Sequence, residues 1–425
     1  MNFKYVIIGG SAGGIGAVEA IRELDKTGSL AVISDEPAPQ YSKPMISEYI
    51  SDGARLEEIV YRSPKFWEEQ SVNIMTGKKV AKVNAPTKEI ILDDGTKIGF
   101  EKLLVATGGK PIVPKVDGIE KRGAYTFASL TDAKLLLEKL PNANHVVVVG
   151  GGLIGVSLAE ALVNLRREVT IIELKDRILS LILDAEGSAL VTEVVEQAGV
   201  RIITGHSVTK IIGKRGSDVQ VGSVVLDDGT ELACDLVVFA IGVTPRVEIV
   251  DPQQIRVNRG IVVDRYMETS APDIYACGDA AEAYDFTYED SRTLPLWPLA
   301  YIGGRVAGSN MAGFETEYPG GTQMSALNYF GLPVISVGIV NPPTDAGFEV
   351  LTSLRQESKI YRTIVLQNDV IAGMILVGKI EGAGIIFDLL KNKVNIKEFK
   401  DRILLEDFGL LYLPEPLRRE MLRRD

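Results

Sequence analysis

The sequence predicts an α/β protein in which one strand–turn–helix–strand unit occurs twice, followed by a smaller α+β region. Three observations lead to this prediction: a glycine-rich turn after an apolar strand, a second copy of the whole unit, and a five-residue sequence that both copies share. The first copy comprises the strand Tyr5–Ile8, the turn 9–16, a helix to Leu24 and the strand Leu30–Ile33. The second copy comprises the strand Val146–Val149, the turn 150–155, a helix to about Leu165 and the strand Val169–Ile172. This order is typical of Rossmann-like dinucleotide-binding domains, so we expect two of them.

The duplication extends beyond the glycine-rich turns. Leu92–Thr96 and Leu226–Thr230 have the same sequence, Leu-Asp-Asp-Gly-Thr, which is typical of a hairpin turn. Each is followed by an apolar strand that ends in a glycine, Leu103–Gly108 in one copy and Leu236–Gly242 in the other. A lone glycine-rich turn is a weak signal, but four matched elements in the same order indicate two nucleotide sites.

The turns predict how each nucleotide is held. The first glycine permits the tight bend, the last lets helix and strand pack, and the pyrophosphate lies at the helix N-terminus. We therefore expect the following residues to bind cofactors: Gly9, Gly10, Ser11, Gly13 and Gly14 in the first copy, and Gly150, Gly152, Leu153, Ile154 and Gly155 in the second. Ser11 stands where the middle glycine of the motif is expected, so the first motif is imperfect.

An acidic residue about 20 positions after each turn is expected to bind a ribose. In the second copy this residue is Glu173, whose carboxylate would accept a hydrogen bond from the 2'-hydroxyl of NADH and repel the 2'-phosphate of NADPH. In the first copy either Asp35 or Glu36 has this role.

Composition excludes several other classes of function. The 425 residues suggest two or three domains, and the net charge of -11 argues against a nucleic-acid partner. We see neither a secretory signal nor an apolar run near the roughly 18 residues of a spanning helix, so we expect a cytoplasmic protein without a membrane segment. Cys234 and Cys277 are too far apart for a Cys-x-x-Cys pair, and with only His145 and His206 we expect no metal site.

Three further motifs carry a resemblance to a known family. The segment Tyr275–Glu282 is an apolar strand that ends in Gly278-Asp279, and it accompanies Ala106-Thr107-Gly108 and Gly242-Val243-Thr244-Pro245-Arg246. Together these resemble the signatures of the pyridine nucleotide-disulfide oxidoreductase superfamily, over residues 1 to about 322. The resemblance implies FAD in the first unit and NAD(P)H in the second, with a chain that returns to the FAD domain.

The resemblance also implies boundaries and flavin contacts. It divides the chain into FAD-binding segments 1–113 and 243–322, an NAD(H)-binding domain 114–242 and a C-terminal α+β interface domain 323–425. Asp279 corresponds to the carboxylate that holds the flavin ribityl chain, beside Gly278. The residues that correspond to the flavin-ring and loop contacts are Ala106, Thr107, Gly108, Gly242, Leu296, Trp297 and Pro298.

The segment Tyr41–Ser47 indicates the branch of the superfamily. Disulfide reductases carry cysteine beside the flavin, and the position of the single cysteine in coenzyme A disulfide reductases and water-forming NADH oxidases falls here on Pro44. Tyr41–Ser47 instead resembles the Tyr-x-[Arg/Lys]-Pro-x-Leu-Ser segment of rubredoxin and ferredoxin reductases, which implies that Lys43 and Pro44 lie near the flavin. The usual lysine and glutamate near flavin N5 correspond to Glu48 and Ser157, so the donor geometry there departs from the family pattern.

The resemblance therefore implies an FAD-dependent NADH:acceptor oxidoreductase that passes electrons to a small acidic carrier of the rubredoxin or ferredoxin type. We expect a homodimer through the C-terminal domain, with the basic clusters Lys391–Lys400 and Leu417–Arg424 as possible docking surfaces. A hydrogen-peroxide-forming NADH oxidase and a coenzyme A disulfide reductase-like enzyme are alternatives, the second opposed by Pro44. A flavin-containing redox-sensing protein with little turnover is the alternative of another class, because Glu48 and Ser157 depart from the pattern.

Overall fold

The structure is a computed structural model that describes residues 1–37, 40–51, 53 and 55–423. The chain separates into two compact units, each assembled from segments distant in sequence. Unit 1 is Met1–Ile112, Ala128–Leu135 and Val243–Gly321, and unit 2 is Val113–Phe127, Leu136–Gly242 and Thr322–Asp425. The predicted α/β class is confirmed, whereas the four predicted domain boundaries remain predictions.

Unit 1 is built on a seven-stranded sheet of order β3-β2-β1-β6-β5-β4, in which β18 also pairs with β6. Its strands are β1 (Asn2–Ile8), β2 (Leu30–Ser34), β3 (Asn73–Thr76), β4 (Val80–Asn84), β5 (Glu89–Leu92), β6 (Lys97–Val105) and β18 (Ile274–Ala276). The pairs among β3, β2, β1, β6 and β18 are parallel, and β4 and β5 add an antiparallel edge. The central strands are rich in Val, Ile and Leu because both of their faces are buried.

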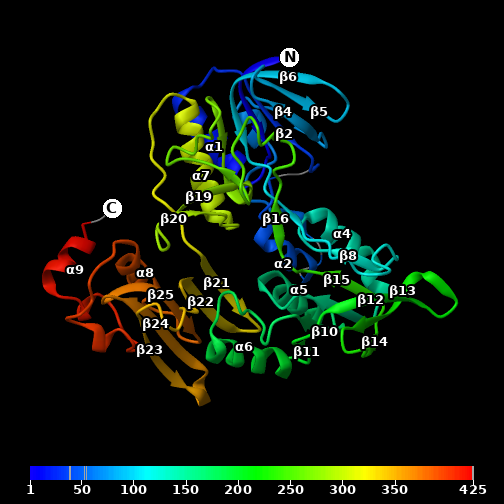
Figure 1. The fold of residues 1–425 in the computed structure, drawn as a ribbon, viewed down its shortest axis with the longest axis vertical. Helices are drawn as coiled ribbons and strands as arrows, with labels where there is room; N and C mark the ends of the chain where they lie inside the picture. Colours follow the sequence, from blue (N-terminus) through cyan, green and yellow to red (C-terminus); the bar gives the residue numbers. More distant parts are fainter. Residues whose placement is uncertain (38–39, 52, 54, 424–425) are drawn as a thin grey trace. The chain divides into compact units, whose positions relative to one another are not determined.

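Smaller elements complete unit 1. They are the strands β7 (Gly109–Pro111), β16 (Val243–Pro245), β17 (Ile261–Val262), β19 (Ala281–Asp285) and β20 (Asp290–Arg292), the helices α1 (Ala12–Leu24), α2 (Ile46–Ser51), α3 (Phe66–Glu69) and α7 (Trp297–Met311), and the 3-10 turns η1 (Lys43–Met45), η2 (Leu56–Glu58) and η4 (Gly278–Ala280). Figure 1 shows α1 and α7 side by side against the sheet. They pack closely, since a Cβ on Gly304 would lie 2.0 Å from the carbonyl oxygen of Gly13 and one on Gly16 would lie 2.4 Å from that of Tyr301.

Unit 2 contains a second parallel sheet, of order β11-β10-β9-β15-β8, and a three-stranded antiparallel sheet β12-β13-β14. The elements are β8 (Ala124–Thr126), β9 (His145–Val149), β10 (Glu168–Glu173), β11 (Arg201–Thr204), β12 (Val208–Lys214), β13 (Ser217–Leu226), β14 (Glu231–Ala233), β15 (Leu236–Phe239), α5 (Leu153–Asn164), α6 (Ala185–Gln197) and η3 (Leu140–Asn142). The helix α4 (Leu130–Lys139) contributes residues to both units.

The C-terminal part of unit 2 is an antiparallel sheet of order β21-β22-β25-β24-β23, with α8 packed against β25. Its elements are β21 (Met324–Tyr329), β22 (Leu332–Gly338), β23 (Phe348–Arg355), β24 (Ile360–Gln367), β25 (Val370–Val377), α8 (Ala383–Lys391), α9 (Glu415–Met421), η5 (Gln356–Ser358), η6 (Lys400–Arg402) and η7 (Leu410–Tyr412). The strands predicted at 361–366 and 370–377 are present in β24 and β25. This part is the predicted α+β region.

The two copies of the repeat share individual hydrogen bonds as well as element order. The N–H of Gly9 donates to the carbonyl of Ile33 and that of Gly150 to the carbonyl of Ile172, both at 2.8 Å. The Leu-Asp-Asp-Gly-Thr segments both close a turn by a bond between their first and last residues, at 2.9 Å. The duplication read from the sequence is therefore present at atomic detail.

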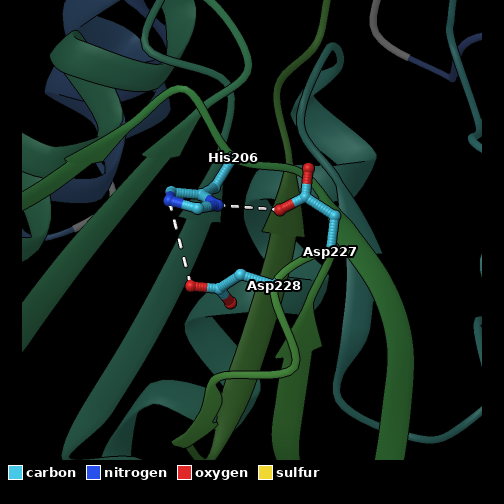
Figure 2. A group of neighbouring side chains, drawn as sticks. All are labelled: His206, Asp227 and Asp228. Carbon is cyan, nitrogen blue, oxygen red and sulfur yellow. Dashed lines mark hydrogen bonds and ion pairs between the residues drawn. The ribbon is translucent and has the colours of Figure 1, made fainter.

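One ion pair contains a lysine in the first copy of the repeat and a histidine in the second, and a histidine changes its charge much closer to neutral pH. In the first copy Lys78 binds Asp94 at 2.9 Å. At the matching place in the second copy, His206 Nδ1 lies 2.8 Å from Asp227 and Nε2 lies 4.0 Å from Asp228 (Figure 2). Because a lysine fills this place in the first copy, we interpret the histidine and the two carboxylates as an ion-pair cluster that ties a turn to a hairpin.

We predict that this junction makes the stability of unit 2 depend on pH. The hydrogen bond to Asp227 raises the pKa of His206 above 6.5. The contribution to stability is therefore fully present below pH 6.5 and is lost as the pH rises through the higher folded-state pKa. In thermal unfolding, His206→Gln should lower Tm at pH 6, and the difference from wild type should shrink as the pH rises above neutral.

Lys78→Gln is the matched control. The pKa of Lys78 is raised above 10.5 by its bond to Asp94, so its effect on Tm should stay constant over the same pH range. Equal pH dependence of the two variants would contradict the assignment to His206.

Candidate functional site

The glycine-rich turn of unit 1 has the shape of a phosphate-binding turn. Gly9 has a φ of +109°, and a Cβ on Gly14 would lie 1.9 Å from the carbonyl oxygen of Gly9, so neither position accepts a side chain. Ser11 is the N-cap of α1 but its side chain makes no capping hydrogen bond, and the first turn of α1 contains no acidic residue. The first N–H groups of α1 are therefore suited to a pyrophosphate.

The turn of unit 2 repeats this geometry. Gly150 has a φ of +113°, and a Cβ on Gly155 would lie 1.9 Å from the carbonyl oxygen of Gly150. Gly152 is the N-cap of α5, whose first turn begins with Leu153 and Ile154 and again lacks an acidic residue. Both units thus present a helix N-terminus that fits a dinucleotide phosphate.

Glu173, at the end of β10, is already held against the turn of unit 2. Its Oε2 accepts a hydrogen bond from the N–H of Gly151 at 2.6 Å, and its Oε1 accepts one from the N–H of Lys175 at 2.8 Å. The side chain is partly buried, and its orientation is fixed by main-chain donors. A carboxylate held in this orientation can accept a hydrogen bond from a ribose hydroxyl.

The corresponding place in unit 1 is occupied by Ser34, and the acidic residues follow it. Ser34 Oγ accepts a hydrogen bond from the N–H of Glu36, as Glu173 does from the residue two positions on. Asp35 forms an ion pair with Arg246 at 2.7 Å, and Glu36 forms one with Lys43 at 2.9 Å. Both predicted ribose ligands are therefore present at the strand end, and each has a basic neighbour.

The two loop motifs predicted near the flavin are joined to each other. Thr107 Oγ1 donates to the carbonyl of Arg246 at 2.7 Å, and the N–H of Arg246 donates to the carbonyl of Gly108 at 2.9 Å. The strands β7 and β16 pair antiparallel beside them. The N–H of Ala106 donates a hydrogen bond to the carbonyl of Ile8 at the end of β1, so the two motifs are connected to the start of the glycine-rich turn. Gly242, with a φ of +107°, ends the equivalent segment of unit 2.

Asp279 lies in η4, where a ribityl chain is predicted. Its Oδ2 lies 3.3 Å from the position that a Cβ on Gly109 would take. Burial raises the pKa of the Asp279 carboxyl, and the positive charge of Lys43 acts in the opposite direction. Among the residues that the structure describes, the main-chain N–H of Asp279 itself donates a hydrogen bond to this carboxylate. A partly buried carboxylate of this kind fits a bound polyhydroxyl chain, whose hydroxyls would donate hydrogen bonds to it.

The segment Tyr41–Ser47 contains Lys43, whose charge acts on the Asp279 carboxyl. Lys43 and Pro44 form η1, and Glu48 lies on the exposed side of α2. Ser157 lies in α5 of unit 2, so Glu48 and Ser157 belong to different units, and their predicted roles remain predictions. A carboxylate does follow Ser157 one helical turn later, but Glu160 accepts a hydrogen bond from the N–H of Phe330 at 2.9 Å.

At the start of α7, Trp297 contacts two aromatic residues, Tyr61 and Tyr301, that belong to none of the motifs predicted from the sequence. Leu296 is the N-cap, and Trp297 and Pro298 form the first turn. The ring of Tyr61 meets that of Trp297 edge to face at 4.9 Å, and Tyr301 stacks on Trp297 at 6.2 Å. Sequence reasoning missed Tyr61 because no motif or spacing connects it with Trp297.

Neither cysteine has the properties of a redox-active thiol. Cys234 and Cys277 are both free and buried, and burial raises the pKa of each to about 12. Cys277 Sγ fills the space that a side chain on Gly13 would need. Both thiols therefore stay protonated at neutral pH and have a packing role.

One residue of each predicted basic cluster forms ion pairs with nearby carboxylates. Lys400 binds both Glu349 and Asp369, and Arg419 binds Glu415. Arg424 lies outside the described residues. Among the helices of the described part of the chain, none is long and apolar enough to cross a membrane.

Comparisons with known proteins identify the family. Residues 3–304 match the model of the pyridine nucleotide-disulphide oxidoreductase family, and residues 324–394 match the rubredoxin NAD+ reductase C-terminal domain. The chain is 28% identical to a Bacillus subtilis nitrite reductase [NAD(P)H], over 93% of this chain and 48% of that protein. It therefore spans about half the length of that relative.

Other relatives match over most of their length. The NADH-dependent phenylglyoxylate dehydrogenase subunit epsilon of Aromatoleum evansii is 28% identical over 94% of both chains. The rubredoxin-NAD(+) reductase of Pseudomonas putida is 29% identical over 74% of this chain and 81% of that one. A solved ferredoxin reductase for the CYP199A2 system of Rhodopseudomonas palustris has a TM-score of 0.83 at 25% identity, over 93% of this chain and 96% of that one.

The match over residues 3–304 covers both glycine-rich turns and Glu173, and also the three motifs on which the resemblance was based. The cofactors are FAD and NAD(H), and the glycine-rich turns of both units fit a dinucleotide. The chain therefore belongs to the pyridine nucleotide-disulphide oxidoreductase family, and its C-terminal part matches the rubredoxin NAD+ reductase C-terminal domain.

Proposed function

We propose that the protein oxidises NADH through FAD and reduces a small one-electron carrier of the rubredoxin or ferredoxin type. The FAD, bound in unit 1, supplies the change from a two-electron hydride to single electrons. The reaction balances as NADH plus two oxidised carriers giving NAD+, one proton and two reduced carriers. In unit 1, Gly9, Gly14, Asp279 and either Asp35 or Glu36 would hold the FAD, and Glu173 in unit 2 would hold the NADH ribose.

The observation that carries this proposal is the absence of a usable thiol near the predicted flavin. Pro44 stands at the place of the single cysteine in the thiol-dependent relatives, and the chain has two cysteines in all. Thiol–disulfide exchange requires a thiolate, and the pKa of about 12 for Cys277 leaves a negligible thiolate fraction at pH 7. Electrons must therefore leave the flavin directly. The rubredoxin NAD+ reductase C-terminal domain supports a carrier protein as the acceptor.

A second candidate is an electron-transfer subunit of a larger enzyme. The relative from Aromatoleum evansii matches over 94% of both chains and is a subunit of a dehydrogenase. The ion pairs of Lys400 and Arg419 agree with this candidate, because these two side chains are less available to attract a soluble acidic carrier.

The acceptor is tested by anaerobic steady-state kinetics with NADH. We expect kcat/KM to be higher with rubredoxin or ferredoxin than with coenzyme A disulfide, and higher than with oxygen in a parallel aerobic assay. Rapid reduction of an artificial dye combined with no reduction of either free carrier would favour the subunit. Faster turnover with the disulfide would contradict the proposal, and oxygen as the best acceptor would favour a peroxide-forming oxidase.

Replacement of Glu173 by serine should reduce the preference for NADH over NADPH. The carboxylate is fixed by two main-chain donors, and a hydrogen bond to a charged group contributes about 1.5–3 kcal/mol. The ratio of kcat/KM for the two cofactors should therefore fall by roughly 10- to 150-fold. Glu168→Ser, at the exposed start of the same strand, is the control and should leave the ratio unchanged. A wild-type enzyme that prefers NADPH would show that the ribose assignment is wrong.

Replacement of Asp279 by alanine should weaken FAD binding. Loss of charge-assisted bonds to the ribityl hydroxyls should raise the Kd for FAD by roughly 10- to 150-fold. The measurement is the ratio of FAD to protein after dilution and gel filtration. Asp290→Ala, on the exposed strand β20, is the control. If the Asp279 variant stays yellow and keeps the wild-type affinity, the carboxylate has only a turn-forming role.

A further inference from the structure

Tyr61 is held beside the segment that carries Lys43. The N–H of Ser42 donates to the carbonyl of Ile59 at 2.8 Å, and the N–H of Tyr61 donates to the carbonyl of Gln40 at 3.3 Å. Tyr41 and Val60 form a β-bridge between these bonds. The position of Tyr61 is therefore fixed by main-chain pairing with the residues on either side of Tyr41.

The ring of Tyr61 meets the first residue of α7. Its centroid lies 4.9 Å from that of Trp297, with an angle of 80° between the planes. Trp297 stacks on Tyr301 at 6.2 Å with an interplanar angle of 3°. Because α7 also packs against η4, which contains Asp279, Trp297 lies on the helix that contacts the predicted ribityl site.

The polar side chains next to Tyr61 and Trp297 form hydrogen bonds, whereas the Tyr61 hydroxyl and the Trp297 indole N–H have no partner among the described residues. Glu19 accepts hydrogen bonds from Arg62 Nε at 2.7 Å and from Tyr301 Oη at 2.6 Å. By contrast, Tyr61 Oη and Trp297 Nε1 are both buried and have no hydrogen-bond partner among the residues that the structure describes. Two adjacent donors without acceptors are unusual in a protein interior and need an explanation.

A bound flavin explains both donors. The isoalloxazine ring has acceptor atoms along one edge and a broad aromatic face, so it can receive hydrogen bonds and contact the two rings. Burial raises the pKa of Tyr61, so that its hydroxyl keeps its hydrogen for donation at neutral pH.

We propose that Tyr61 is a further flavin-binding residue, whose hydroxyl together with Trp297 Nε1 donates hydrogen bonds to the isoalloxazine ring of FAD. This inference rests on the proposed binding of FAD in unit 1. It adds to the site a residue that lies outside every glycine-rich or acidic motif of the chain.

The test uses the purified full-length protein with and without FAD, and the variants Tyr61→Phe, Tyr61→Leu and Trp297→Phe. Tyr61→Phe should shift the absorption bands of bound FAD and raise its Kd about two- to tenfold, as expected for the loss of one neutral hydrogen bond. Tyrosine and tryptophan in contact with a flavin quench its fluorescence by electron donation, and phenylalanine and leucine do not. Bound FAD should therefore fluoresce more strongly in Tyr61→Leu and Trp297→Phe than in wild type.

Thermal unfolding separates a ligand contact from a structural effect. Removing an unpaired buried hydroxyl should leave the FAD-free protein as stable or more stable, while the rise in Tm on adding FAD should become smaller. Tyr329→Phe is the matched control, because its hydroxyl is also buried and without a partner among the described residues, but it lies in β21 of unit 2. This control should leave the absorption, the fluorescence and the FAD-dependent Tm shift unchanged.

The outcomes distinguish this inference from the function on which it rests. A wild-type protein that binds FAD, combined with Tyr61 variants whose spectrum, fluorescence and Kd match wild type, would overturn the inference alone. A wild-type protein that cannot be loaded with FAD would overturn the proposed function and the inference together.

Discussion

The close packing of α1 against α7 is the constraint on which unit 1 depends. The two helices approach until Gly304 meets the main chain of Gly13 and Gly308 meets that of Ala17, with Cβ positions 2.0 and 2.5 Å from the facing carbonyl oxygens. No side chain larger than hydrogen fits at these contacts. Because α1 begins at the first glycine-rich turn and α7 follows Asp279, this packing joins the two ends of the predicted FAD site.

The same packing explains the surroundings of the helix pair. Cys277 fills the space above Gly13, which makes this thiol a buried packing group. On the outer side, Glu19 and Glu23 of α1 bind Tyr301 and Arg305 of α7. These polar bonds orient Tyr301 and thereby support the ring of Trp297 at the helix start. The aromatic pair thus depends on contacts made one or two turns along the helices.

The internal repeat shows which features are structural and which are adapted to a ligand. The turn geometry and the hairpin bonds are the same in both copies, because both must present a helix N-terminus to a phosphate. The strand ends differ, with Glu173 in one copy and Ser34 in the other. That difference agrees with two different dinucleotides, whose phosphates are alike but whose remaining contacts are not. The change from Lys78 to His206 lies beside these strand ends, because the N–H of Lys78 donates to the carbonyl of Ser34 and that of His206 donates to the carbonyl of Glu173.

The sequence by itself determined the fold class, the duplicated unit and the two glycine-rich turns whose geometry fits a dinucleotide. It could do so because phosphate binding requires glycine and an acidic residue at nearly fixed spacing within one local strand–helix unit, and such a pattern is visible in the chain. It also determined that a thiol-based mechanism lacks its cysteine at Pro44. Only the tertiary structure showed that Asp35 and Glu36 have basic partners, that Cys277 packs against Gly13, and that Tyr61 contacts Trp297. These contacts join residues from distant parts of the sequence, and side-chain partners of that kind follow from packing between elements, which no local pattern encodes.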